Sequence, residues 1–180
     1  MGNAIISVAE VLEEHVVFED LALVHDLRAG GTEITFNSQL GIGHKMDIGA
    51  DLPLAPRGHV VFSVTRMVYD RGRARARAAL LNIGAPGEEQ AELVLGYDVR
   101  DWTAHLGAAA GAGRGCWFGG ATWHVAEDWM IHLEYHAGER AAAAGFEWAL
   151  SEQCSVLCSR IMEEGGKGRV FLDLIFTKRF

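Results

Sequence analysis

Residues 59–83 read HVVFSVTRMVYDRGRARARAALLNI, and they give the clearest structural signal in the chain. Residues 59–69 are rich in β-branched and aromatic side chains, which favour strands. Residues 70–72 are a turn signal, because glycine adopts positive φ at little steric cost. Residues 73–83 then alternate arginine with alanine before becoming apolar. The stretch therefore predicts a β-hairpin.

Further strands are predicted on both sides of this hairpin, from the alternation of apolar and polar residues. A turn signal at residues 29–32 joins two of them into a second hairpin. The last strand opens at Val170 and is apolar on both faces, which is typical of a strand that is central or covered by a helix. The other predicted strands are 16–28, 33–40, 92–102 and two within 116–136.

Two helices are predicted from apolar residues at helical spacing. Asn3 is a candidate N-cap, and a short amphipathic helix follows over residues 4–15. The stronger helix covers residues 140–164, where apolar side chains step by four, four, three and four residues. This apolar face comprises Phe146, Leu150, Cys154, Leu157 and Ile161. The glycines at 165 and 166 then end the helix.

Two glycine-containing segments, 41–58 and 107–120, interrupt these patterns and are predicted as loops. Together the elements predict an α+β, β-dominated fold. It is a curled antiparallel sheet or barrel with an N-terminal helix and a long helix before the last strand. No linker or internal repeat divides the chain, so residues 1–180 are predicted to form a single domain.

Composition and charge narrow the classes of partner. The formal net charge is −8, and an acidic surface disfavours nucleic acid and anionic membranes. No apolar run reaches the ~20 residues of a spanning helix, and no secretory signal is visible. The odd cysteine count (Cys116, Cys154 and Cys158) is typical of reduced thiols. We therefore predict a cytoplasmic protein that binds neither nucleic acid nor membrane.

The candidate catalytic residues are three alternating polar side chains, His132, Glu134 and His136, with His124 from the neighbouring strand. Positions two apart on a strand share a face, so two imidazoles and a carboxylate would lie together. Such a group suits acid–base catalysis or a divalent metal. The plainer interpretation, which we favour, is the solvated face of an amphipathic strand.

The candidate ligand-binding residues are aromatic and recur every six residues: Trp117, Trp123, Trp129 and Tyr135. They predict either core packing, which is the favoured interpretation, or an aromatic-lined pocket for a hydrophobic ligand. A second pattern, the alternating arginines of residues 71–77, predicts an anion site or a charge ladder with carboxylates such as Glu92. The ladder is the favoured interpretation.

No motif for a phosphate loop, dinucleotide fold, zinc protease or nucleophile elbow occurs, so no cofactor is assigned. The leading hypothesis is a barrel-like protein that binds a small hydrophobic molecule, with a lyase, isomerase or cyclase step by acid–base chemistry. One alternative is a non-catalytic structural or interaction protein that forms a homo-oligomer. Another is a metal-dependent enzyme that uses the His132, Glu134 and His136 face.

Overall fold

The computed structural model describes residues 12–56, 58–111, 114–164 and 168–179. All the regular secondary structure in this part of the chain is β-strand. These twelve strands are 8 to 13 residues long. They are β1 (Val16–Asp26), β2 (Thr32–Gly43), β3 (Met46–Ala55), β4 (Val61–Arg71), β5 (Ala74–Ile83), β6 (Gln90–Val99), β7 (Trp102–Gly111), β8 (Arg114–Ala126), β9 (Trp129–His136), β10 (Ala141–Ser151), β11 (Cys154–Glu163) and β12 (Gly168–Arg179).

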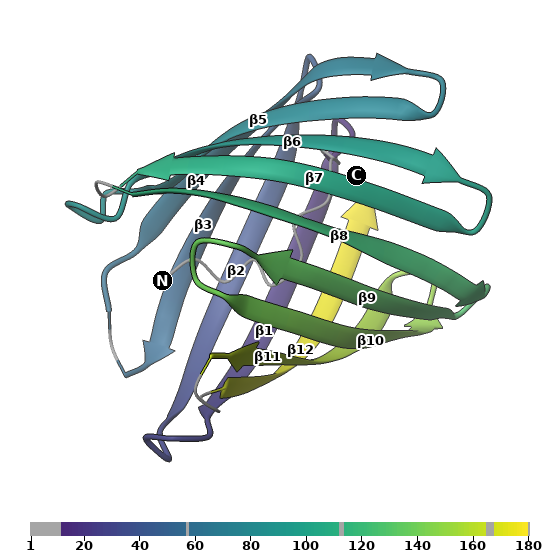
Figure 1. Cartoon of the computed structure of the whole chain (residues 1–180). Helices are drawn as coiled ribbons and strands as arrows, with labels where there is room; N and C mark the ends of the chain where they lie inside the picture. Colours follow the sequence, from purple (N-terminus) through teal and green to yellow (C-terminus); the bar gives the residue numbers. More distant parts are fainter. Residues whose placement is uncertain (1–11, 57, 112–113, 165–167, 180) are drawn as a thin grey trace.

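The strands form a closed antiparallel barrel in which each strand pairs with its neighbours in sequence. Figure 1 shows β1 to β12 following one another around the ring. The ring is closed by β1 and β12, whose register runs without a break from Val16 opposite Arg179 to Asp26 opposite Arg169. Closure leaves no sheet edge, so the backbone groups of the strands are paired within the barrel.

The two ends of the barrel differ in their connections. At the end where β1 starts and β12 finishes, all five connections have two residues: 44–45, 72–73, 100–101, 127–128 and 152–153. His44 and Lys45 both have positive φ, 52° and 56°, as a tight hairpin turn requires. At the opposite end most connections are longer, such as 27–31, 56–60 and 84–89. We call these the turn end and the loop end.

The polarity of the two faces is the reverse of that of a water-soluble barrel. Many of the side chains that alternate outward are large, apolar and exposed, such as Leu95 at 51% and Trp117 at 59%. Side chains that alternate inward include charged residues with little exposure, such as Glu134 at 4% and Asp173 at 5%. The described chain therefore has a largely apolar outer wall around an interior that holds most of its buried polar groups, beside two small apolar clusters around Phe171 and Phe118.

The predicted helix over residues 140–164 is wrong, because this segment is the hairpin of β10 and β11. Steps of four residues keep side chains on one face of a strand as well as on one face of a helix. Phe146, Trp148 and Leu150 alternate outward, while Ala141, Ala143 and Gly145 are small and buried facing inward. The polar residues at 152–153, between Ser151 and Cys154, form the turn between the two strands, but the helical spacing masked this turn signal.

The fold-class prediction is therefore wrong in its helices, whereas the barrel and the antiparallel sheet are confirmed. Most of the predicted 4–15 helix lies outside the described residues, and residues 12–15 are not helical. The predicted loop 41–58 consists mainly of the end of β2 and of β3, and 107–120 contains parts of β7 and β8. The single domain over residues 1–180 stays a prediction.

Candidate functional site

The inner wall of the barrel carries polar side chains from every part of the sheet. Those with less than a tenth of their surface exposed and with inward alternation are Thr35, Asp47, Thr65, Glu92, His105, Thr122, His132, Glu134, Ser159 and Asp173. Buried polar groups are costly unless they have partners, so their pairing decides what the interior can do. We call this polar interior the lumen.

Two arginines of β5 point into the lumen and are neutralised there. Arg77 Nη2 donates to Glu92 Oε1 at 2.7 Å, and these side chains are only 14% and 5% exposed. Arg75 Nη2 donates to Asp98 Oδ1 at 2.6 Å, and the Thr103 hydroxyl donates to the same oxygen at 2.9 Å. The predicted charge ladder is thus confirmed for Arg77 and Glu92.

Two of the predicted catalytic residues meet a histidine that the sequence analysis missed. Glu134 bonds His105 Nε2 through Oε2 at 2.8 Å and His136 Nε2 through Oε1. The side chains of Glu134 and His105 are fully buried. His105 lies inward on β7 between Thr103 and Gly107, just before the stretch 107–120 that was predicted as a loop. Alternation of polar with small residues in β7 was the missed signal.

His132 lies on the same inner face but has separate partners. Its Nδ1 bonds the Thr122 hydroxyl at 3.0 Å, and its Nε2 bonds Glu147 Oε2 at 3.2 Å. The Ser155 hydroxyl donates to the other Glu147 oxygen at 2.6 Å. His124 follows Thr122 and Trp123 on β8 and is exposed near the turn end, where its backbone N–H donates to the Asp101 carbonyl; among the described residues, no side-chain hydrogen bond joins it to His132 or Glu134. A catalytic role for these residues stays a prediction.

Glycines let aromatic rings lie flat against the inner wall. A Cβ added to Gly107 would overlap the ring of Phe118, and one added to Gly120 would contact the His105 ring and the backbone of β9. Phe118 is 1% exposed and stacks on His136 with ring centroids 5.3 Å apart. The Phe118 and His105 rings therefore occupy space that a larger residue at 107 or 120 would take.

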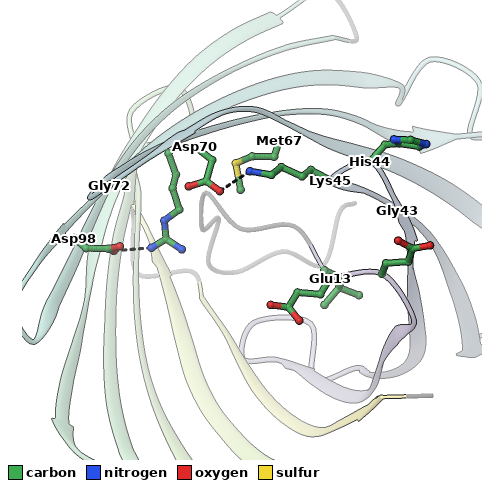
Figure 2. A pocket seen from close by; sticks show the side chains of 11 residues that line it. Glu13, Gly43, His44, Lys45, Met67, Asp70, Gly72 and Asp98 are labelled. Atoms are coloured by element: carbon green, nitrogen blue, oxygen red, sulfur yellow. Dashed lines mark hydrogen bonds and ion pairs between the residues drawn. The ribbon is translucent and has the colours of Figure 1, made fainter.

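A cavity of about 690 Å³ opens into the lumen at the turn end. Figure 2 shows Glu13, Lys45, Met67 and Asp70 around this opening, with Lys45 Nζ bonded to Asp70 Oδ2 at 2.7 Å. Residues 12–14 line the same cavity. The Leu12 N–H donates to the lumen carboxylate of Asp47 at 3.2 Å. Residues 12–14 thus lie across part of the opening.

The four predicted ligand-binding aromatics, Trp117, Trp123, Trp129 and Tyr135, all lie on the outer face of the barrel. They do not line one common pocket, although Trp117 borders an apolar hollow of about 400 Å³ on the outer wall with Leu93, Leu95 and Leu106. Trp123 stacks on Trp102 at 5.1 Å between ring centroids, and Trp129 stacks on Trp148 at 5.3 Å. These two pairs lie beside the two-residue turns, so they form an aromatic cluster on the outer wall near the turn end. Ligand binding by these rings stays a prediction.

Metal binding gains no support from the described residues, which contain no group of three His, Cys, Asp or Glu side chains placed to hold an ion. His132 and Glu134 lie on the same face but form separate hydrogen-bond networks, since His132 bonds Glu147 and Glu134 bonds His105. In the described part of the chain, no helix is long and apolar enough to cross a membrane.

The comparisons with known proteins identify the fold. No protein-family model matches the chain, and no curated protein matches it. Among solved structures, the NanC porin is similar at TM-score 0.68 and 10% identity, covering 88% of this chain and 98% of that one. The KdgM porin is similar at TM-score 0.65 and 8% identity, covering 88% of this chain and 98% of that one. Omp33, an outer membrane protein of Acinetobacter baumannii, is similar at TM-score 0.57 and 9% identity, covering 95% of this chain and 100% of that one.

Three sequence-based expectations are overturned by the barrel and its neighbours. The cytoplasmic location and the absence of membrane contact conflict with a fold shared with outer-membrane porins. The lyase, isomerase or cyclase acting on a hydrophobic substrate conflicts with a lumen that is polar and an apolar surface that lies outside. The two alternative functions, a structural homo-oligomer and a metal-dependent enzyme, assumed a water-soluble protein, so they are overturned with this expectation. At these identities, the similarity establishes that the chain shares the porin barrel fold.

Proposed function

We propose that this protein is a membrane-spanning barrel of the outer-membrane type and forms a channel for small water-soluble solutes. The observation that carries this proposal is the inverted polarity of the wall, apolar outside and polar inside. In water, so many exposed apolar side chains would be an aggregation hazard, because soluble monomers rarely expose large contiguous apolar patches. In a bilayer the same surface meets hydrocarbon.

The dimensions of the strands agree with this proposal. A transmembrane β-strand needs about 9–11 tilted residues to cross the hydrocarbon core, and β3, β5, β6, β7 and β11 each have 10. Antiparallel closure satisfies the backbone groups of the strands where no water is available, which lipid requires. Hydrocarbon can therefore surround the described strands.

The aromatic cluster near the turn end supports an orientation. Tryptophan and tyrosine gather at membrane–water interfaces, and bacterial barrels place short turns on the periplasmic side. The pairs Trp102–Trp123 and Trp129–Trp148 lie beside two-residue turns at the end where the described chain begins and finishes. We infer that the turn end faces the periplasm and that the longer connections face outward.

The lumen supports passage of polar solutes. Its charged side chains bind one another along the wall, as Arg77 does with Glu92 and His105 with Glu134. Two aromatic side chains, Phe118 and His105, lie flat over glycines. The NanC and KdgM porins share this fold, and the latter has been solved in complex with disordered oligogalacturonate. We propose passage of small hydrophilic molecules through the interior of this barrel too.

Solute uptake into proteoliposomes tests the proposal. Vesicles that contain the purified protein should swell in neutral sugars, with rates that fall as the sugar becomes larger. Asn37 faces the lumen and its neighbour Phe36 faces outward, so the two positions form a matched pair. Asn37→Trp should slow swelling, and Phe36→Trp should leave it unchanged. Equal rates for vesicles with and without inserted protein would refute the channel.

A further inference from the structure

Three lumen carboxylates have no cationic partner among the described residues: Asp20 on β1, Asp51 on β3 and Asp173 on β12. The register places Asn37 of β2 opposite both Asp20 and Asp51. Asp173 lies opposite Ala22, the next inward position after Asp20 on β1. These four polar residues form one continuous part of the inner wall, which we call the acidic patch.

Two oxygens of the acidic patch lack a hydrogen-bond donor among the described residues. Asp20 Oδ1 and Asn37 Oδ1 are buried, and no described residue hydrogen-bonds either of them. Asp173 is only 5% exposed, and no hydrogen bond or ion pair to its carboxylate is found in the described part of the chain. The unpaired Oδ1 atoms and the carboxylate of Asp173 are acceptors. The partner that they lack is therefore a hydrogen-bond donor or a cation.

The other buried carboxylates of the described lumen have partners, and Asp47 accepts a hydrogen bond from the Leu12 N–H. Asp98 and Glu92 bind arginines, Glu134 binds two histidines, and Glu147 binds His132 and Ser155. The uncompensated negative charge of the described lumen is therefore concentrated where β12, β1, β2 and β3 adjoin. Carboxylates this close to one another repel, and a mobile cation relieves that repulsion.

We propose that the acidic patch makes the channel select cations over anions, with small inorganic and organic ammonium-type cations as the favoured solutes. This inference rests on the channel proposed above. The carboxylates are not grouped tightly enough to chelate an ion, so they act through their field. A cleft lined by one sign of charge between low-dielectric walls raises the local concentration of counter-ions, and rings of Asp or Glu are a usual basis of cation selection.

The experiment is a planar-bilayer recording in an asymmetric KCl gradient, with purified protein. Conductance steps test the channel, and the sign of the reversal potential tests the selectivity. We expect the permeability ratio of K⁺ over Cl⁻ to exceed one. It should fall toward one in the triple variant Asp20→Asn, Asp51→Asn, Asp173→Asn. The outward-facing Glu19→Gln on the same strand is the control and should keep the wild-type ratio.

The outcomes separate the two proposals. Absence of conductance steps from folded, inserted protein overturns the channel itself. Steps with a ratio at or below one, or a triple variant that inserts and keeps the wild-type ratio, overturn the acidic patch as its selectivity element. If the triple variant does not insert, the wild type still decides. Its ratio should decline as total KCl rises, because salt screens charges, and a ratio independent of salt refutes the proposal.

Discussion

Replacing Leu95 by arginine distinguishes a wall that faces lipid from one that faces water. Leu95 lies in the middle of β6, is 51% exposed and points outward. Its cross-strand neighbours are Ala76 and Leu106. On a water-soluble protein, an arginine at such an exposed position would change stability by less than about 0.5 kcal/mol. In a bilayer the same substitution places a charge in hydrocarbon.

The expected cost follows from the position of Leu95 along the strand. It is four residues from Val99 at the turn end and five from Gln90 at the other end of β6. With a rise of ~3.4 Å per residue and a tilt of ~45°, it lies ~10–12 Å from either end of the wall. Arginine near the bilayer midplane costs about 2–4 kcal/mol, and arginine near an interface about 0–1 kcal/mol. Val99, 45% exposed beside a turn, is the matched interfacial position.

The assay is reversible unfolding of each variant by urea in phospholipid vesicles, followed by tryptophan fluorescence. Leu95→Arg should lower the free energy of unfolding by about 2–4 kcal/mol, and Val99→Arg by less than about 1 kcal/mol. A loss for Leu95→Arg no greater than that for Val99→Arg would refute a lipid-facing wall. Folding of Leu95→Arg in plain buffer with wild-type stability would refute it as well.

Two further predictions concern the inner wall. Arg77→Ala should lower the free energy of unfolding by about 3–5 kcal/mol, because Glu92 would be left buried without its cation; the double variant Arg77→Ala, Glu92→Ala should lose less, and an equal or larger loss would contradict this pairing. Gly107→Leu should cost about 1–3 kcal/mol by displacing the Phe118 ring, measured as a lower thermal midpoint. The outward neighbour substitution Ala108→Leu should not produce this loss, and equal midpoints would contradict the packing of Phe118 over Gly107.

Local strand signals were readable from the sequence, and the hairpin of residues 59–83 appears as β4 and β5. β1 and the paired β8 and β9 also follow the predicted segments closely. These segments share β-branched or aromatic side chains on alternate positions and polar turns between them. Such signals are local, so they survive whichever face meets the solvent.

The small-residue strands could not be recognised in the same way. In β7, Ala104, Leu106 and Ala108 alternate with His105 and Gly107, and this alternation has little contrast in hydropathy. In β10 and β11, the apolar residues from Phe146 to Ile161 looked helical because steps of three and four residues fit one helix face, and steps of four also keep one strand face. Transmembrane strands give a weaker signal per segment than helices do, so the pattern of twelve was missed.

The candidate site was predicted in part because alternation shows which residues share a face. His132, Glu134 and His136 do lie on one inner face. The sequence does not say whether that face points to water outside or to a lumen inside, since both are polar. The assumption that apolar faces point inward therefore placed Trp117 and its aromatic partners inside, whereas closure of the barrel places them outside.

Fluorescence quenching tests the central claim of an outward apolar wall most directly. All five tryptophans, Trp102, Trp117, Trp123, Trp129 and Trp148, are exposed on that wall. In reconstituted vesicles, phospholipids brominated on their acyl chains should quench most of the tryptophan emission, and aqueous acrylamide should quench little of it. Strong acrylamide quenching with no response to brominated lipid, from protein that stays monomeric without detergent, would contradict a membrane-spanning barrel.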